Sequence, residues 1–300
     1  MNRKVVEIGG RRLSIANLEK ELYPSCSFTK AHVLEYYRRI ADHLIPHLRD
    51  RAVTLKRYPD GVEEEFFFEK RCPPHPEWVQ TAEIDLKGKE RLTACLVNDR
   101  ATLIWVANLA ALELHVPLAG ATSPGTPDAM VFDLDPGEPA DVLACAQVAL
   151  ILRELLSRLG LTGFVKSSGR KGLHVYVPLN STGATFDDTK GFSRAVALIL
   201  QKNYPELVTG RMAKEERRGK VFINWSQNDA KKTMICVYSL RAGEKPMVSF
   251  PLGWEELEQL ARERRPEGCW VSPEEALERV EKDGDLFQEM LVMKQILPHM

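Results

Sequence analysis

The chain has 300 residues, of which 44% are hydrophobic, so it can bury a substantial core within one large domain or two fused modules. This composition excludes a chain that is disordered over most of its length. The 41 Lys and Arg nearly cancel the 42 Asp and Glu, and the net charge of −1 gives no overall sign of a polyanionic partner. Residues 254–300 carry 12 acidic and 6 basic side chains, so we expect any polyanion-binding site upstream of them.

The sequence shows no sign of a membrane segment. Its most apolar stretch, residues 101–121, contains Asn108, Glu113 and His115 and is therefore not a membrane span. The first residues lack the continuous apolar run of a signal sequence. We expect a cytoplasmic protein with no membrane partner.

Six cysteines are scattered along the chain with no C-x-x-C pair. In a cytoplasmic protein of this size, that pattern predicts free thiols. Cys72-Pro-Pro-His75 has the form of half a zinc site, but no second pair stands at a matching spacing.

Hydrophobic periodicity and turn residues predict the elements of the first part of the chain. They are a short helix over residues 14–23 that ends at Pro24, a longer helix that Thr29 caps and Pro46 ends, a β-hairpin of residues 52–56 and 65–68 around Pro59-Asp60-Gly61, and a helix over residues 99–115. We place a soft boundary after residue 120, which divides the chain into an N-terminal half (1–120) and a C-terminal half (121–300).

Strands and helices alternate more regularly in the second part of the chain. The expected elements are a strand over 129–135, a helix over 141–159, a strand over 163–166, a glycine loop over 167–172, a strand over 173–178, a helix over 190–202, a strand over 221–225, an edge strand over 234–239, and a C-terminal helix that Ser272 caps. The order indicates an α/β (α+β) chain with a central mixed or antiparallel sheet flanked by helices.

Two acids stand close together in Val131-Phe132-Asp133-Leu134-Asp135-Pro136. Side chains at i and i+2 of a strand point to the same face, so Asp133 and Asp135 project together where Pro136 ends the strand. Paired carboxylates of this kind bind Mg²⁺ or Mn²⁺ in phosphoryl-transfer enzymes. The alternative is a strand-end turn whose acids only face water.

The segment Lys166-Ser-Ser-Gly-Arg-Lys-Gly-Leu-His174 has the composition of an anion-binding loop. Its glycines allow backbone N–H groups to turn toward an anion, Ser168 offers a hydroxyl, and Lys171 supplies charge. It is not a Walker A loop, because G-x-x-x-x-G-K-[ST] does not occur in it. The alternative is a surface turn rich in Gly and Lys.

Two further segments have the composition of a nucleic-acid surface. The basic loop of residues 211–220 suits a phosphate backbone, although a solvated charged loop would have the same composition. Phe66, Phe67 and Phe68 stand near Lys56, Arg57 and Lys70, and an exposed Phe beside cations can stack on a base. A strand that is buried on both sides is the competing interpretation.

Together these residues resemble a known family, the polymerase domain of bacterial ligase D and its stand-alone relatives in the archaeo-eukaryotic primase superfamily. The resemblance runs from about Ser14 to Arg241. Its motifs are D-L-D-P at 133–136, S-G-x-K-G-L-H at 168–174 and R-x-G-K-V-F-I-x-W-x-Q-N at 217–228, with further matches at 58–61, 108–109, 113–115 and 238–241.

The resemblance implies a primase-polymerase fold in a bacterial or archaeal protein, with an N-terminal half that grips DNA (1–120) and a catalytic half (121–300). It implies template-directed addition of nucleotides at broken or gapped DNA ends. It implies Mn²⁺ or Mg²⁺ in a two-metal site and a preference for ribonucleotides. It also implies DNA with 5′-phosphorylated ends and nucleoside triphosphates as substrates, and a separate DNA ligase and a Ku-like end-binding protein as partners.

The roles of single residues follow from the same resemblance. It implies metal ligation by Asp133 and Asp135, triphosphate binding by Ser168, Lys171, His174, Gln227 and Arg241, and a place near the nucleotide for His115. It further implies a 5′-phosphate pocket of Asn17, Lys20 and Lys30, a template platform of Phe67 and Phe68 beside Lys70, and a DNA-end contact at Arg217 or Arg218.

One catalytic position departs from the family pattern. Asn224 stands where the family has a third acid, which removes one negative charge from the metal site. We expect the site for one of the two ions to be weakened, so that the chain binds DNA and nucleotide but extends poorly. The alternatives are a weakly catalytic module that bridges DNA ends and a metal-dependent phosphoesterase.

Overall fold

A computed structural model describes residues 3–85, 91–180 and 183–298, and these form two compact units. Unit 1 consists of residues up to Pro117 together with Ile235–Val248 and Ser272–Asp285. Unit 2 consists of Leu118–Met234, Ser249–Val271 and the residues from Leu286 onward. The chain therefore returns to unit 1 twice after residue 120, and the predicted division of roles at that residue stays a prediction.

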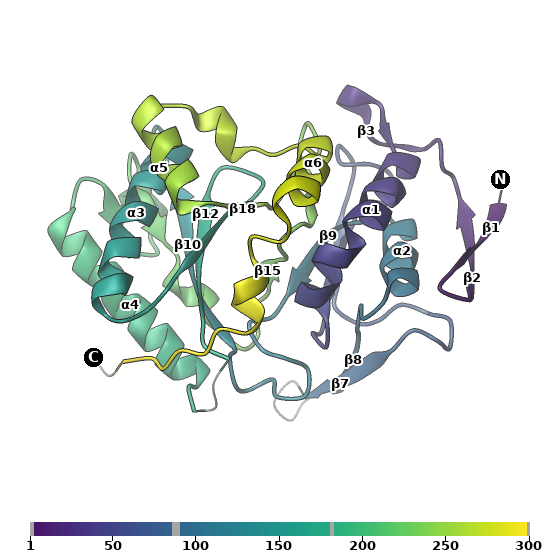
Figure 1. Cartoon of the computed structure of the whole chain (residues 1–300), viewed down its shortest axis with the longest axis horizontal. Helices are drawn as coiled ribbons and strands as arrows, with labels where there is room; N and C mark the ends of the chain where they lie inside the picture. Colours follow the sequence, from purple (N-terminus) through teal and green to yellow (C-terminus); the bar gives the residue numbers. More distant parts are fainter. Residues whose placement is uncertain (1–2, 86–90, 181–182, 299–300) are drawn as a thin grey trace. The chain divides into compact units, whose positions relative to one another are not determined.

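Unit 1 is built around a small antiparallel sheet in which β5 pairs with both β6 and β9. Helix α1 lies alongside α2, and the hairpin of β1 and β2 stands at the edge of this unit (Figure 1). Its elements are β1 (Arg3–Ile8), β2 (Arg11–Ala16), β3 (Glu21–Tyr23), β4 (Phe28–Thr29), α1 (Lys30–Leu48), β5 (Thr54–Arg57), β6 (Phe67–Glu69), β7 (Thr81–Asp85), β8 (Arg91–Cys95), α2 (Arg100–Asn108), β9 (Ala111–Val116), β16 (Leu240–Arg241), β17 (Met247–Val248) and α6 (Pro273–Asp283).

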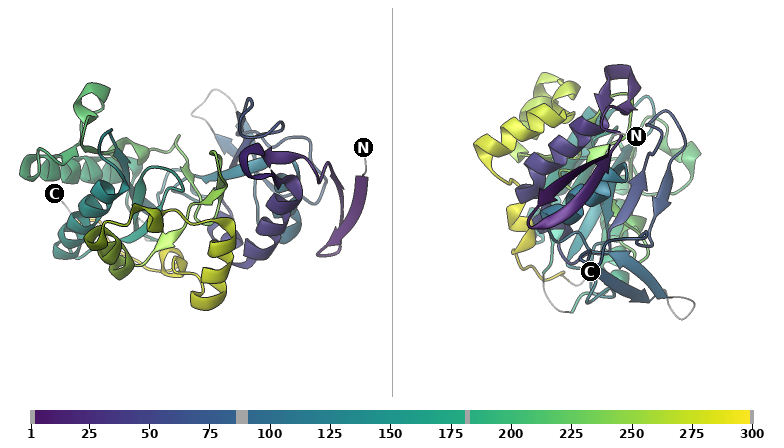
Figure 2. Two further views of the ribbon diagram at one scale, coloured as in Figure 1. Left: turned by 90° about the horizontal axis from the view of Figure 1, so that it is seen from above. Right: turned by 90° about the vertical axis from the view of Figure 1, so that its right-hand side faces the viewer.

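Unit 2 contains a six-stranded mixed sheet in the order β13-β14-β10-β12-β11-β18. Helices α3, α4 and α5 contribute to its core, and α3 and α5 lie side by side (Figures 1 and 2). Its elements are β10 (Ala129–Pro136), α3 (Val142–Arg158), β11 (Phe164–Ser167), β12 (Leu173–Pro178), α4 (Phe186–Asn203), β13 (Val208–Thr209), β14 (Val221–Ile223), β18 (Pro251–Leu252) and α5 (Trp254–Glu263), and β15 (Met234–Ile235) leads back to unit 1.

Strand alternation divides the two faces of this sheet. Met130, Phe132 and Leu134 of β10 belong to the core that α3, α4 and α5 complete. Because successive side chains point to opposite faces, Asp133 and Asp135 project from the other face. The predicted fold class, a mixed sheet flanked by helices, is confirmed.

Two predicted helices were wrong. Residues 14–23 form the end of β2 and then β3, because Leu13 and Ile15 are buried at alternate positions and Asn17 adopts a left-handed φ of 58°. The helix expected over 99–115 ends at Asn108, Ala110 turns with a φ of 59°, and β9 follows. Residues 111–114 are all buried, so no periodicity distinguished helix from strand.

Smaller corrections concern element ends. Pro46 does not end α1, which continues to Leu48, because a proline in the last turn removes only one hydrogen bond. Helix α4 begins at Phe186, where Thr185 and Asp188 form a capping box. The strand expected over 234–239 ends at Ile235, and Tyr238 turns with a φ of 63° before β16.

The cysteine prediction was wrong for one pair. Cys72 and Cys95 form a disulfide that ties the segment after β6 to the end of β8, whereas Cys26, Cys145, Cys236 and Cys269 are not disulfide-bonded. The pair lies 23 residues apart in the sequence and shares no short motif, so composition gave no signal for it. In the described residues, no group of three or more His, Cys, Asp or Glu side chains could hold a metal ion, zinc included.

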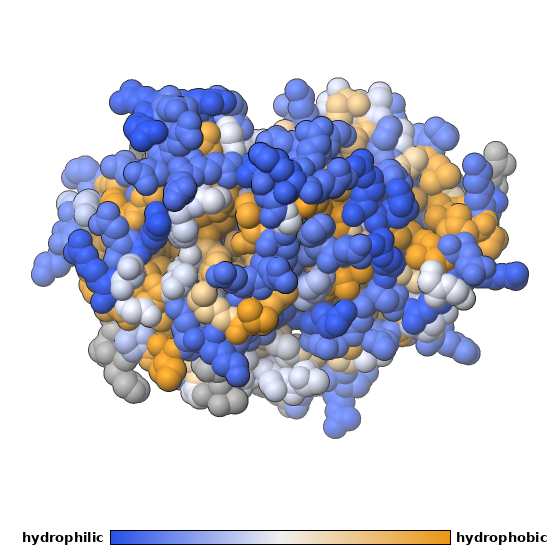
Figure 3. Space-filling view, viewed as in Figure 1, coloured by the Kyte–Doolittle hydropathy of each residue, from blue (hydrophilic) through white to orange (hydrophobic). Residues whose placement is uncertain are grey.

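The described part of the chain contains no helix that is long and apolar enough to cross a membrane. The face of the molecule in Figure 3 is mostly hydrophilic, with apolar side chains scattered among polar ones. A surface of this mixed character is usual for folded proteins.

Candidate active site

Asp133 is the buried centre of a polar cluster in unit 2. Its Oδ2 accepts hydrogen bonds from Nδ2 of Asn224 at 3.1 Å and from Nε2 of Gln227 at 3.3 Å, and its Oδ1 lies 3.3 Å from Nε2 of His174. Burial acts to raise the pKa of Asp133, but the contacts with His174, Gln227 and Asn224 outweigh it and hold the pKa below its usual value. The carboxylate is therefore ionised at neutral pH.

The sheet register explains why these residues meet. Asp133 of β10 pairs with His174 of β12, and His174 in turn pairs with Lys166 of β11. The backbone N–H of Asn224, just after β14, donates to the carbonyl of Asp133 at 2.8 Å. Residues far apart in the sequence thus line one face of the sheet.

Lys166 is a functional candidate that the sequence did not reveal. Its side chain is 1% exposed, and its Nζ donates to Nδ1 of His174 at 3.0 Å and to Oγ of Ser249 at 2.5 Å. Because an ammonium group can only donate, Nδ1 of His174 accepts and the ring proton sits on Nε2, facing Asp133. Lys166 therefore fixes the tautomer of His174.

Asn224 does not present a metal ligand in this arrangement. Its Oδ1 accepts from the hydroxyl of Ser226 at 2.8 Å, and Lys232 donates to that same hydroxyl at 2.8 Å. The amide nitrogen of Asn224 therefore faces Asp133. Asp135, exposed at the end of β10, supplies the second carboxylate, so the side chains present fit one divalent ion better than two.

The glycine loop of residues 168–172 packs directly on β10. A Cβ atom at Gly172 would lie 2.2 Å from the carbonyl oxygen of Leu134, so only glycine fits there. The hydroxyl of Ser168 accepts from the backbone N–H groups of Arg170 and Gly172, both at 3.2 Å. These N–H groups bind Ser168, whose own O–H stays available as a donor toward an anion.

The predicted cations of unit 2 have different surroundings. Lys171 is 76% exposed and pairs with Glu138 at 2.7 Å. Arg217 turns inward, with its guanidinium carbon 3.8 Å from the ring centre of Phe222, whereas Arg218 is exposed. Of the two arginines, Arg218 is the more exposed.

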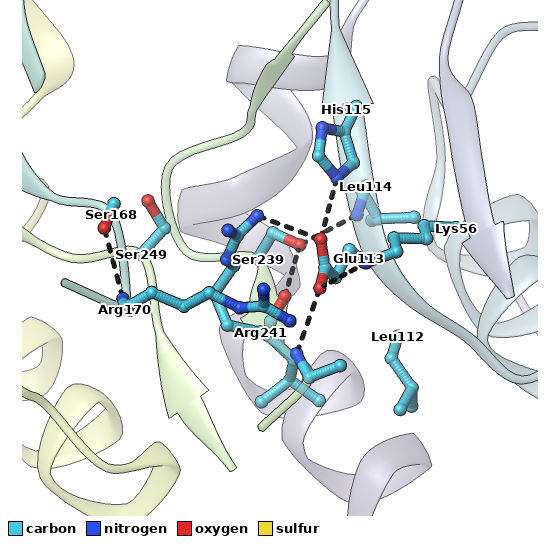
Figure 4. A network of polar contacts seen from close by, with 12 residues as sticks. Lys56, Leu112, Glu113, Leu114, His115, Ser168, Arg170, Ser239, Arg241 and Ser249 are labelled. Carbon is cyan, nitrogen blue, oxygen red and sulfur yellow. Dashed lines mark hydrogen bonds and ion pairs between the residues drawn. The ribbon is translucent and has the colours of Figure 1, made fainter. Parts of the chain in front are cut away.

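His115 and Arg241, predicted near the nucleotide, lie in unit 1 and meet at Glu113 (Figure 4). Nε2 of His115 and NH1 of Arg241 both lie 2.9 Å from Oε2 of Glu113. Burial acts to raise the pKa of Glu113, but His115, Arg241 and Lys56 lower it to about 2. Glu113 itself appeared in the sequence only as part of a motif.

The residues predicted for a 5′-phosphate pocket come together in unit 1. The backbone N–H of Lys30 donates to the carbonyl of Lys20 at 2.8 Å, and that of Lys20 to the carbonyl of Asn17 at 3.1 Å. Burial, and secondarily the charge of Lys20, lower the pKa of Lys30 to about 8. Two neighbouring ammonium groups of this kind suit an anion between them.

The aromatic residues of the β5–β6 hairpin are exposed. Phe67 and Phe68 are 44% and 55% exposed, and Phe66 before them is 49% exposed. Lys70 is exposed as well. The alternative of a strand buried on both sides is therefore wrong, and the exposed rings can stack on bases.

Comparisons with known proteins identify the family. Residues 29–287 match the family described as LigD, primase-polymerase domain. The chain belongs to the LigD primase-polymerase domain family. It is 41% identical over 284 residues to the multifunctional non-homologous end joining protein LigD of Mycolicibacterium smegmatis, and 38% identical over 294 residues to the LigD repair protein of Mycobacterium tuberculosis.

A solved structure supports the same family. The polymerase domain of Mycobacterium tuberculosis ligase D in complex with DNA matches with a TM-score of 0.87 and 36% identity, over 95% of this chain and 99% of that one. The Bacillus subtilis LigD protein is 35% identical over 82% of the chain. The predicted family and its class of enzyme, a DNA nucleotidyltransferase of the primase-polymerase type, are confirmed.

The likeness covers only part of the curated relatives. The chain matches 92% to 93% of its own length to the mycobacterial LigD proteins but only 35% to 37% of theirs. The comparisons assign the family and the fold, whereas the roles of single residues stay predictions.

Proposed function

We propose that the chain adds nucleotides from nucleoside triphosphates to a primer 3′-hydroxyl on gapped or broken DNA, as a polymerase of non-homologous end joining. The observation that carries this proposal is the buried cluster of Asp133, His174, Asn224 and Gln227 beside the glycine loop, in a chain of the LigD primase-polymerase family. The names of the relatives, which are end-joining proteins, support the repair setting.

Asp133 and Asp135 are the residues that would hold a divalent ion, Mn²⁺ or Mg²⁺. Bound there, the ion would offset charge on the triphosphate and on the attacking oxygen. His174 keeps its Nε2–H toward this site, and Ser168 can donate its hydroxyl to a phosphate oxygen. Lys171 would exchange Glu138 for a phosphate oxygen. Its ion pair with Glu138 lies at the surface, where such pairs contribute little free energy.

Asn224 makes extension slow in this proposal. With its oxygen bound to Ser226 and its nitrogen toward Asp133, Asn224 adds no negative charge to the site. An ion bound beside the primer hydroxyl would then have fewer anionic ligands. Binding of DNA and nucleotide does not depend on that ion to the same extent.

The test is primer extension on gapped DNA with a downstream 5′-phosphate, in Mn²⁺, for the parent chain beside Asn224→Asp. We expect the aspartate to raise the extension rate by about tenfold or more, since it restores a charged ligand. Asn203→Asp is the matched control, because it makes the same change on the exposed end of α4. Equal rates for the parent and Asn224→Asp would contradict the proposed role of Asn224.

The same assay tests the finer expectations. Parallel reactions with ribo- and deoxyribonucleotides measure the preferred sugar, and we expect ribonucleotides to be used faster. Omission of the downstream 5′-phosphate tests the pocket of Asn17, Lys20 and Lys30. We propose a cytoplasmic site of action, with a Ku-like protein and a DNA ligase activity completing the repair.

A second candidate is a module that binds and bridges DNA ends with little catalysis, and the orientation of Asn224 favours it. Tight binding of a 5′-phosphorylated end with no extension by either the parent or Asn224→Asp would identify this function. The third alternative, a phosphoesterase, predicts loss of labelled DNA without added nucleotide, and no observation favours it.

A further inference from the structure

Glu113 of β9 is a buried carboxylate of unit 1 that several neighbouring groups contact. Its side chain is 1% exposed. Its Oε2 lies 2.9 Å from Nε2 of His115 and 2.9 Å from Nη1 of Arg241. Its Oε1 accepts from the backbone N–H of Ala242 at 3.2 Å, the hydroxyl of Tyr58 at 3.3 Å and Nζ of Lys56 at 3.5 Å. Figure 4 shows His115, Arg241 and Lys56 converging on it from separate elements. Such a group sets the geometry of every side chain that it binds.

Glu113 determines which nitrogen His115 can offer to a ligand. An ionised carboxylate only accepts, so the proton of the neutral ring sits on Nε2, and Nδ1 carries the lone pair. Burial is the main cause that lowers the pKa of His115, which favours this neutral form. In Figure 4 the other ring nitrogen points away from Glu113.

Glu113 also connects these residues to the aromatic surface of the β5–β6 hairpin. Nζ of Lys56 lies 4.0 Å from the ring centre of Phe66 and 5.4 Å from that of Phe68. Phe68 also makes an edge contact with His115, with ring centres 5.8 Å apart. Lys56 itself is buried, so it supports the exposed rings from below.

We propose that Glu113 is a positioning residue that holds His115 and Arg241 for the nucleotide and, through Lys56, the aromatic rings for the template. The inference rests on the proposed nucleotide-binding role of His115 and Arg241. The alternative is that Glu113 belongs to a buried ion cluster that only stabilises the fold. The two differ because a positioning residue acts through its partners, so its removal has little effect once those partners are gone.

The test is a double-mutant cycle on nucleotide affinity, measured by titration of a nucleoside triphosphate with Mn²⁺ into the DNA-bound chain. We expect Glu113→Gln to weaken binding by about tenfold, and by less than about twofold in a chain that already carries Arg241→Met and His115→Ala. Glu35→Gln is the matched control, since Glu35 pairs with Arg38 on the exposed face of α1. Equal losses in both backgrounds would overturn the proposal.

Two further measurements keep the test independent of folding defects. Glu113→Asp keeps the charge but is one methylene shorter, and we expect an intermediate loss of affinity. Nitrogen-15 spectra of histidine report the ring of His115 directly, and a Nε2 signal that is unchanged in Glu113→Gln would overturn the proposal. No nucleotide binding by the parent chain would overturn the proposed function itself, whereas normal parent binding with unchanged Glu113→Gln overturns only this inference.

The template arm uses a fluorescent base analogue at the templating position. Stacking on the rings quenches its emission, and we expect Glu113→Gln and Lys56→Met to reduce that quenching to a similar extent. Quenching that only Lys56→Met reduces would overturn the connection between Glu113 and the aromatic surface.

Discussion

Glu113 in unit 1 and Asp133 in unit 2 are both buried carboxylates, but their partners differ in charge. Glu113 contacts Arg241 and Lys56 as well as His115, whereas Asp133 is held by the amides of Asn224 and Gln227 and by the imidazole of His174. The chain itself neutralises Glu113. Asp133 keeps a negative charge that amide donors only partly offset, which suits a cation supplied from outside.

In the roles that we propose, this difference distinguishes Glu113, which positions other side chains, from Asp133, which would hold a divalent ion. Removal of the charge at Glu113 takes a carboxylate away from the buried Lys56 and the part-buried Arg241, which is costly for folding. Removal of the charge at Asp133 leaves neutral donors, which lose little. Burial and a lowered pKa are common to both residues, so the identity of the partners is the property that distinguishes them.

Neutralising each carboxylate in turn tests this difference most directly. We expect Asp133→Asn to reduce single-turnover extension about a thousandfold or more, with a change in the free energy of unfolding below ~1 kcal/mol. We expect Glu113→Gln to lower the free energy of unfolding by ~3 kcal/mol. Denaturant unfolding of both variants gives the answer. A Glu113→Gln chain as stable as the parent would mean that the two sites do not differ in this way.

The sequence alone predicted the parts of the fold that local patterns determine. The hairpin around Gly61, the acidic end of β10 and the cap of α6 at Ser272 depend on neighbouring residues, and each is present. Residues 14–23 and 109–115 were assigned to helices wrongly, because left-handed turns at Asn17 and Ala110 redirect the chain where the apolar pattern fits either element.

Sequence motifs predicted only some of the residues of the site. Asp133, Ser168 and His174 stand in short motifs, whereas Lys166 joins them through the register of three strands, which no local pattern specifies. Glu113 meets Lys56 and Arg241 because β9 pairs with β5 and packs beside β16. Such long-range pairings depend on tertiary packing and not on sequence spacing.

The next test concerns the surroundings of Asp133. Lys166→Met removes the donor to Nδ1 of His174, so the ring can move its proton away from Asp133. We expect extension to fall by about ten- to a hundredfold, as for other residues that orient a ligand-binding histidine. The matched change Lys202→Met, on the exposed end of α4, should leave the rate unaltered. A Lys166→Met chain that extends at the parent rate would show that the tautomer of His174 is unimportant.

The smallest expected effect is in unit 1, where Lys20 and Lys30 place cations that the chain does not neutralise fully. Lys20 pairs with Asp60 at 2.6 Å. In the described part of the chain, the ammonium group of Lys30 donates to the backbone carbonyl of Ala16 and not to a carboxylate. With a pKa of about 8, Lys30 loses its proton as the pH rises from 7 to 9, so binding of a 5′-phosphate should weaken by about tenfold over that range. Titration of 5′-phosphorylated DNA beside 5′-hydroxyl DNA isolates the contribution of the phosphate to binding, because only the phosphorylated end depends on the pocket.

In Lys30→Arg the cation stays charged at pH 9, and the pH dependence should disappear. If it persisted in that variant, another group that titrates between pH 7 and 9 would control phosphate binding.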